Sequence, residues 1–247
     1  MPTRVGLWLT NRLRIGRGPV RLQPAGSLAG LAPDTAECVA RLRRRYGLRF
    51  ESRLPRDAAL ENYVYLDLFD RLRSALAERW PLGATVLDVG SKSFHYAAAL
   101  HAVLQPSRLT GIEVEGYRLF ANLHNRHDYA MAHIAGLTDT DYEVGDVRRW
   151  QRPVGVVSCC YPFVFAEVQG AWGLPRSLFD PAGQFRAMAA ALKPGGWLLM
   201  VNQGEDEAEA AAGHARGAGL ACSHRQCVTE PLLPRPAPPV LSAWQRA

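Results

Sequence analysis

Apolar positions along this chain form two kinds of pattern, and the two alternate. Short uninterrupted apolar runs predict buried strands, and longer segments with an apolar stripe predict amphipathic helices. The first clear run covers Thr85–Val89, and a long striped segment, 58–79, precedes it. Such alternation is typical of parallel strands joined by helical crossovers. The pattern therefore predicts an open sheet with helices on both faces.

The remaining elements are expected in the same alternating order. Further strands are predicted over residues 108–114, 142–144, 154–159 and 197–202, and crossover helices over 94–104, 117–134, 181–192 and 205–218. Two strand-like pieces follow, over 221–229 and 240–246, joined by a Pro-rich connector. They predict an antiparallel hairpin that closes one sheet edge. The fold class is thus α/β: a doubly wound, mostly parallel, seven-stranded sheet with a C-terminal antiparallel hairpin, plus an N-terminal helical arm.

The N-terminal part has a different character. Residues 1–32 mix glycine, proline and arginine with little periodicity and are expected to form a loose arm. A helix is predicted over Pro33–Tyr46, with Gly47 ending it. We expect an Arg-rich, partly helical arm over 1–57 and the main domain over 58–247.

Charge and cysteine content limit the function classes. The net charge is +6, but residues 1–60 hold twelve Arg and four acids, which gives +8 and leaves −2 for the rest. The basicity therefore belongs to the arm and gives only modest support for nucleic-acid binding. Five cysteines without CxxC spacing and no long uncharged apolar run argue against a disulfide framework, a metal site and a membrane span. A cytoplasmic protein is expected.

Acidic and small residues follow the predicted strands. In a doubly wound sheet a ligand binds outside the carboxyl ends of the strands, where strand order reverses. Asp88 ends the first strand, Glu113 ends the second and Asp146 follows the third. Glu113 lies 25 residues after Asp88, near the ~20-residue offset of an acid that binds a ribose diol, with Glu115 as the competing candidate.

These carboxylates limit the chemistry of the ligand. They would repel a pyrophosphate, and the glycines that a pyrophosphate needs are missing. Asp146 can accept a hydrogen bond from a purine amine, and Asp88 can orient the glycine turn or hold a ligand ammonium. A cationic cofactor with an amino acid moiety fits better than a dinucleotide. That description matches S-adenosyl-L-methionine.

Over about 62–246 the sequence resembles the class I S-adenosylmethionine-dependent methyltransferases. Segment 86–94 is similar to the family's strand and glycine motif, Gly111-Ile112-Glu113 to its second-strand acid, and 145–147 to its Gly-Asp motif. Segment 192–199, with Lys-Pro-Gly-Gly, is the most distinctive match. The cofactor residues that strand ends and resemblance together nominate are Asp88, Gly90, Ser91, Lys92, Glu113, Asp146, Val147 and Ser158.

Two departures from the family pattern bear on the site. Lys92 and Phe94 stand where the second and third glycines of the motif would be. Either Lys92 points to solvent or toward the ligand's carboxylate, or the pocket is altered. Tyr161-Pro162-Phe163 keeps only the Pro-aromatic part of the Asn-Pro-Pro-aromatic motif that presents an amine for methylation in some relatives. These rings are expected to form a wall of the substrate pocket instead.

The expected function is methyl transfer from S-adenosylmethionine to an unidentified, small-molecule acceptor. No residue stands out as a catalytic base, and the catalytic residues stay unassigned. The first alternative is a non-catalytic adenosyl-ligand-binding or scaffold protein on the same fold. The second is an RNA or nucleic-acid methyltransferase that uses the basic arm.

Overall fold

A seven-stranded sheet forms the centre of the protein, in the order β3-β2-β1-β4-β5-β7-β6. The computed structural model describes residues 16–247. β7 runs antiparallel to the other six strands, so the predicted fold class is confirmed. The strands are β1 (Thr85–Val89), β2 (Arg108–Glu113), β3 (Thr140–Val144), β4 (Val154–Cys160), β5 (Leu192–Gln203), β6 (Leu220–Cys227) and β7 (Pro239–Arg246).

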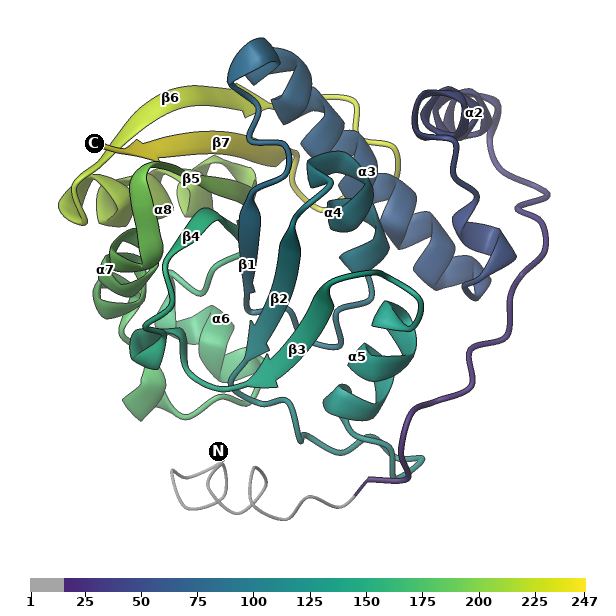
Figure 1. Ribbon diagram of the computed structural model, residues 1–247, viewed down its shortest axis with the longest axis horizontal. Coiled ribbons are helices and arrows are strands. Elements are labelled where there is room, and N and C mark those ends of the chain that lie inside the picture. The colour runs from purple at the N-terminus through teal and green to yellow at the C-terminus, as the bar shows by residue number, and fades with distance from the viewer. Residues whose placement is uncertain (1–15) are drawn as a thin grey trace.

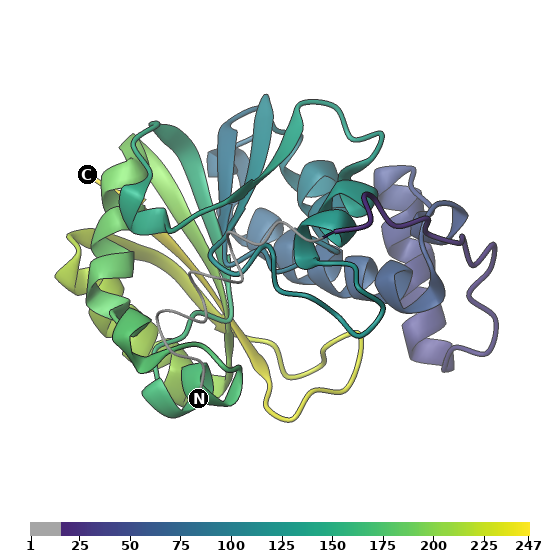
Figure 2. The same ribbon diagram turned by 90° about the horizontal axis from the view of Figure 1, so that it is seen from below.

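Helices cover both faces of this sheet. In Figures 1 and 2, α7 and α8 lie on one face, α3, α4 and α5 lie on the other, and α2 is outermost on the α3 side. The short α6 follows β4. The helices are α2 (Pro33–Tyr46), α3 (Arg56–Leu76), α4 (Ala97–Leu104), α5 (Arg126–Ile134), α6 (Ala166–Ala171), α7 (Pro181–Ala191) and α8 (Gly204–Gly217).

Alternating side chains of the central strands supply the two hydrophobic cores. Val86 of β1 and Val156 of β4 belong to the core under α3 and α4, whereas Leu87 and Val157 belong to the core under α7 and α8. All four are almost completely buried. Removing each such side chain from water stabilises the fold by roughly 1.5–3 kcal/mol. Burial on both faces explains why these strands read as unbroken apolar runs.

Strand order reverses between β1 and β4, and this point positions the site. Asp88 of β1 pairs in register with Gly111 of β2 on one side and with Ser158 of β4 on the other. The carboxyl ends of these strands therefore open on one edge of the sheet. A crevice outside that edge is the usual ligand site in a doubly wound sheet.

The helix predicted over 117–134 is shorter than expected. It begins only at Arg126, because Asn125 caps it: the Asn125 side chain accepts from the Asp128 amide, and the Asp128 side chain accepts from the Asn125 amide. Leu123 has a φ of +64°, which a helix does not allow. The prediction was wrong for its first half, where residues 114–125 form a loop beside the strand ends.

The N-terminal segment packs against the main domain. Residues 1–15 of the predicted arm lie outside the described residues, and 17–32 have neither helix nor strand. Helix α2 matches its predicted bounds, and Gly47 ends it with a φ of +64°. Val39 and Leu42 of α2 are buried in the same core as α3. The domain boundary at residue 57 stays a prediction.

Ion pairs join α2 to α3 and also to the turn that follows α2. Arg41 Nη2 lies 2.7 Å from Asp67 Oδ1 and Arg45 Nε lies 3.0 Å from Asp70 Oδ1, while Arg43 Nη2 lies 2.9 Å from Glu51 Oε1. Part of the arm's positive charge is thus balanced inside the protein. Within residues 16–247, no helix has the length and apolarity to cross a bilayer.

Candidate functional site

A cleft opens at the carboxyl ends of β1, β2, β3 and β4, where sequence patterns predicted the site. Including its open mouth it holds about 910 Å³ of space. We call it the strand-end cleft. Its walls come from residues at or after the ends of these four strands and from the segment between α6 and α7. They include Gly90, Lys92, Glu113, Glu115, Asp146, Val147, Tyr161, Phe163, Trp172 and Leu178.

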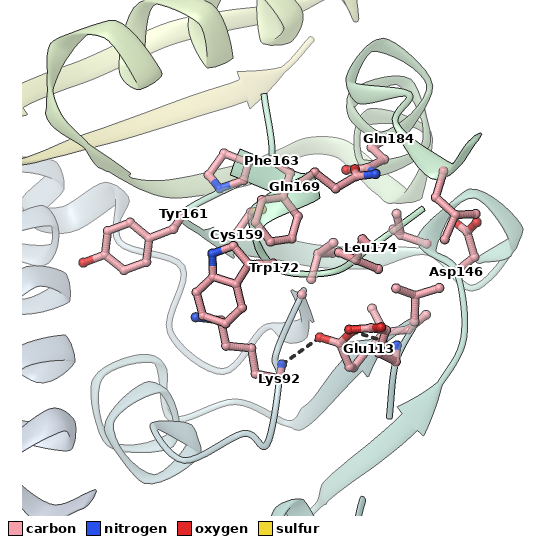
Figure 3. A pocket seen from close by; sticks show the side chains of 18 of the residues that line it. Lys92, Glu113, Asp146, Cys159, Tyr161, Phe163, Gln169, Trp172, Leu174 and Gln184 are labelled. Atoms are coloured by element: carbon pink, nitrogen blue, oxygen red, sulfur yellow. Dashed lines mark hydrogen bonds between the residues drawn. The ribbon is translucent and has the colours of Figure 1, made fainter. Parts of the chain in front are cut away.

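Glu113 lies at the centre of this cleft. Its carboxylate accepts from the Lys92 amide at 3.0 Å and from the Glu115 amide at 2.8 Å, so it ties the β1–α4 turn to the β2–α5 loop (Figure 3). Arg126 Nη1 lies 3.5 Å from Glu113 and 3.3 Å from Glu115. A carboxylate has about four lone-pair sites, so each Glu113 oxygen can still accept a further hydrogen bond.

Asp146 lies at the other end of the cleft from Lys92 (Figure 3). Its carboxylate accepts from the Arg148 amide at 2.9 Å and from Arg148 Nη2 at 2.6 Å. Arg148 also reaches Asp180, 3.2 Å away. Partial burial raises the pKa of Asp146, but the hydrogen bonds from Arg148 outweigh it, so the pKa lies below its usual value. Asp146 is therefore a carboxylate held in place by an arginine.

Asp88 lies beneath the cleft rather than on its wall. It is completely buried and accepts from the Tyr96 hydroxyl at 2.7 Å and from Ser158 Oγ at 2.6 Å. Burial raises its pKa to about 7, although the two hydrogen bonds oppose the shift. Asp88 thereby connects β1, β4 and the residue before α4. It supports the turn that carries Gly90.

The glycine motif keeps its backbone conformation although two of its glycines are replaced. Gly90, Lys92 and Phe94 have φ values of +75°, +51° and +50°. Side chains disfavour this left-handed region by roughly 1–2 kcal/mol per residue. Phe94 is completely buried, and its ring lies so close to Gly111 that a Cβ there would be 2.8 Å from it. Phe94 therefore fills space below the turn and does not plug the cleft.

Lys92 lies where the strand-end cleft meets α6. Its ammonium is 4.1 Å from the centre of the Trp172 ring, a cation–π contact, and its carbonyl accepts from the Tyr142 hydroxyl. Burial first, and then the positive charge of Arg126, lowers the pKa of Lys92. The side chain does not extend into open solvent.

The structure brings together five of the eight nominated cofactor residues. Gly90, Lys92, Glu113, Asp146 and Val147 line the strand-end cleft, and so does the alternative ribose partner, Glu115. The other three, Asp88, Ser91 and Ser158, are fully buried and are not among the lining residues. The cofactor contacts of all eight stay predictions.

Several lining residues had no signal in the sequence. Arg126 begins a helix that the pattern placed earlier, and Trp172 follows a short helix that was not predicted. Arg148 stands two residues after Asp146, and that spacing could have identified it. Gln169 of α6 and Gln184 of α7 reach the cleft only through the tertiary fold.

Comparisons with known proteins give the fold a name. Neither family models nor curated proteins match this sequence. Solved structures do match it, and S-adenosylmethionine-dependent methyltransferases are prominent among them. The protein has the class I methyltransferase fold. Sequence identities are low, so the likeness concerns the fold.

Three solved structures illustrate this class I methyltransferase fold. An S-adenosylmethionine-dependent methyltransferase from Clostridium acetobutylicum aligns over 85% of this chain and 99% of its own, with a TM-score of 0.53 and 8% identity. A candidate RNA methyltransferase from Pyrococcus horikoshii aligns over 74% of this chain and 84% of its own, with a TM-score of 0.53 and 12% identity. The [4+2]-cyclase SpnF aligns over 72% of this chain and 81% of its own, with a TM-score of 0.52 and 15% identity. The cyclase shows that this fold does not fix the reaction.

Other titratable groups near the cleft offer no obvious nucleophile or metal site. Burial raises the pKa of the Cys159 and Cys160 thiols, so both are protonated core residues at neutral pH. Burial lowers the pKa of His95 and His133 to about 4, which leaves both rings neutral. Among residues 16–247 no group of three or more His, Cys, Asp or Glu side chains is arranged to bind a metal.

Proposed function

We propose that this protein is an S-adenosylmethionine-dependent methyltransferase that acts on a small molecule. The observation that carries the proposal is the position of Glu113. On a class I methyltransferase fold it lies in the cleft at the strand-order switch, between the glycine turn and the β2–α5 loop. This is where a ribose diol is bound in doubly wound nucleotide sites.

The strand-end cleft fits this cofactor along its length. Glu113 keeps hydrogen-bonding capacity on both oxygens for the ribose hydroxyls. A Cβ at Gly90 would meet no atom within 4 Å, so the turn leaves open space above its backbone. Asp146 and Val147 lie at the end suited to adenine, and the Lys92 ammonium suits the carboxylate of the amino acid moiety.

The bound cofactor would supply an electrophilic methyl group on a sulfonium. The side chains of this protein would contribute alignment and electrostatic stabilisation rather than a covalent step. Asp88 would act from below, by holding Tyr96 and Ser158 so that the turn keeps its shape. No described side chain of the cleft is assigned as a general base.

Isothermal titration calorimetry with S-adenosylhomocysteine tests this function. We expect saturable binding, and we expect Glu113→Gln to weaken it at least tenfold, because a diol hydrogen bond to a charged group contributes about 1.5–3 kcal/mol. Glu143→Gln is the matched control, since Glu143 pairs with Arg152 at the surface. Absence of binding by the folded wild-type protein would contradict the proposal.

Two observations support this proposal over the alternatives. The left-handed backbone at Lys92 and Phe94 preserves the glycine turn, which supports a working cofactor site over a scaffold role. Three of the four arginines of α2 pair with acids of the protein itself, which supports a small-molecule acceptor over RNA. Cytoplasmic location stays a prediction.

A further inference from the structure

A second cavity lies beside the strand-end cleft, on the side of α3. It shares Lys92, Tyr161, Phe163 and Trp172 with the cleft, so these side chains separate the two spaces. Including its open mouth it holds about 1150 Å³. We call it the α3-side cavity. Its other walls come from α3, from α8 and from the β6–β7 connector, which Figure 2 shows folded back toward α3.

Two buried polar atoms of this cavity have no hydrogen-bond partner in the described part of the chain. They are the Tyr161 hydroxyl and Arg235 Nε. Leaving a buried donor unpaired destabilises a protein, so such groups need an explanation. Figure 3 shows that Tyr161 points away from the other labelled side chains of the strand-end cleft. A polar ligand in the α3-side cavity would satisfy both atoms.

The charges of the cavity favour a ligand with a negative oxygen. Arg235 Nη2 holds Glu61 at 3.1 Å, so that carboxylate is already paired. Glu207 accepts from Asn202 and from the Gln203 amide, and burial raises its pKa. The Lys92 ammonium lies over the Trp172 ring, and the charges of Glu113 and Glu61 act on it. Two residues with unsatisfied donors therefore line this space, together with the Lys92 ammonium.

The walls between these donors are aromatic. Phe163 and Trp172 have ring centres 6.2 Å apart, and Tyr65 and Tyr161 have theirs 6.5 Å apart. Tyr65 is stacked on Tyr96 at 4.1 Å, which fixes its ring. An aromatic wall favours a planar ring as its ligand, because ring pairs attract one another beyond the burial of their area. Shape and charge together select a flat ligand that carries an acidic oxygen.

We propose that the α3-side cavity binds the methyl acceptor, and that the acceptor is an aromatic ring bearing a phenolic hydroxyl or a carboxylate. This inference rests on the proposed methyltransferase function. The ionised acceptor oxygen bonds to the methyl carbon as the carbon–sulfur bond breaks and its electron pair stays on sulfur. A phenolic proton leaves to water through the open mouth before attack. The negative oxygen and the positive sulfonium both become neutral, so charge balances.

Binding to the full-length protein saturated with S-adenosylhomocysteine tests the inference. The probes are catechol, benzoate and benzylamine, measured by calorimetry. We expect catechol or benzoate to bind at least tenfold more tightly than benzylamine, because the cavity offers donors and a cation. Radiolabelled S-adenosylmethionine then shows whether catechol or benzoate receives the methyl group. The result distinguishes a phenolic oxygen from a carboxylate oxygen as the acceptor.

Variants locate this binding in the α3-side cavity. Tyr161→Phe and Arg235→Lys each remove one unpaired donor and should weaken the preferred probe about tenfold, the effect of one hydrogen bond. Arg235→Lys should leave the affinity for S-adenosylhomocysteine within about twofold, because Arg235 does not line the strand-end cleft. Arg225→Lys, at a surface ion pair, should change neither affinity. Tight benzylamine binding, or unchanged probe affinity in both variants, overturns the inference while methyl transfer stands. Failure to bind S-adenosylhomocysteine overturns both proposals.

Discussion

At the scale of single residues, the acids after the strands have different roles. Glu113 and Asp146 reach the strand-end cleft, but Asp88 is turned inward and is held by Tyr96 and Ser158. Sequence position showed that all three follow strands, because strand ends are readable from apolar runs. It did not show orientation, since the partner hydroxyl of Tyr96 comes from the next element. Burial and hydrogen bonding therefore separate a supporting acid from a ligand-facing one.

Asp88 gives a residue-scale prediction about pH. Its pKa is raised from 3.8 to about 7 in the folded protein, so folding favours the protonated form. This contribution to stability is fully present below about pH 4 and is lost as pH rises through 7. Asp88→Asn cannot ionise and should lack this loss, which amounts to a few kcal/mol at ~1.4 kcal/mol per pKa unit.

Urea unfolding of both proteins between pH 4 and 8 measures this difference. The free energy of unfolding of wild type relative to Asp88→Asn should fall over that range, most steeply between pH 5 and 7. Other titrating groups act on both proteins and cancel in the comparison. A constant difference would show that Asp88 is ionised throughout.

At the scale of elements, the strands were the most predictable part. Buried parallel strands are continuous apolar runs, so β1 was predicted at its observed bounds. Helix α2 was also predicted at its observed bounds. The error at residues 117–134 arose because apolar periodicity continues through 117–125, while Asn125 and Asp128 start α5 later. A capping box is visible in a sequence, but tertiary contacts decide which candidate cap is used. The α6 segment was missed because it is only a short helix.

The α5 cap supplies an element-scale prediction. Asn125→Ala removes the side-chain acceptor of the Asp128 amide and should lower the free energy of unfolding by about 1 kcal/mol, as caps commonly do. It should also weaken S-adenosylhomocysteine binding slightly, because Arg126 follows the cap and lies beside Glu113. Urea unfolding and calorimetry check the two effects. Asn125→Ser, which retains a capping oxygen, should recover most of the stability; an equal loss in both variants would contradict the role of the cap.

At the scale of the whole molecule, charge has to be located before it is interpreted. The sequence carries +6 overall and +8 within residues 1–60, a distribution that invites an RNA-binding interpretation. The structure shows that three arginines of α2 form ion pairs with Asp67, Asp70 and Glu51. Composition could not reveal those pairs, because their acids lie in the turn after α2 and on α3. We therefore expect the full-length protein to bind RNA weakly and without saturation at physiological salt.

Fluorescence anisotropy with a labelled RNA oligonucleotide, measured between 50 and 200 mM salt, checks this expectation. An interface that contacts roughly 6–10 phosphates loses about 10³–10⁵ in affinity over that range, from a tight starting value. We expect no saturable RNA binding above about 150 mM salt. Methyl transfer to a small aromatic acceptor should be little changed by the same salt, because the contacts of the acceptor in the α3-side cavity are partly buried and weakly screened. Arg41→Gln should lower stability, since it leaves Asp67 less well paired, without changing RNA affinity. Submicromolar, strongly salt-dependent binding lost on removing residues 1–32 would instead assign the acceptor to nucleic acid.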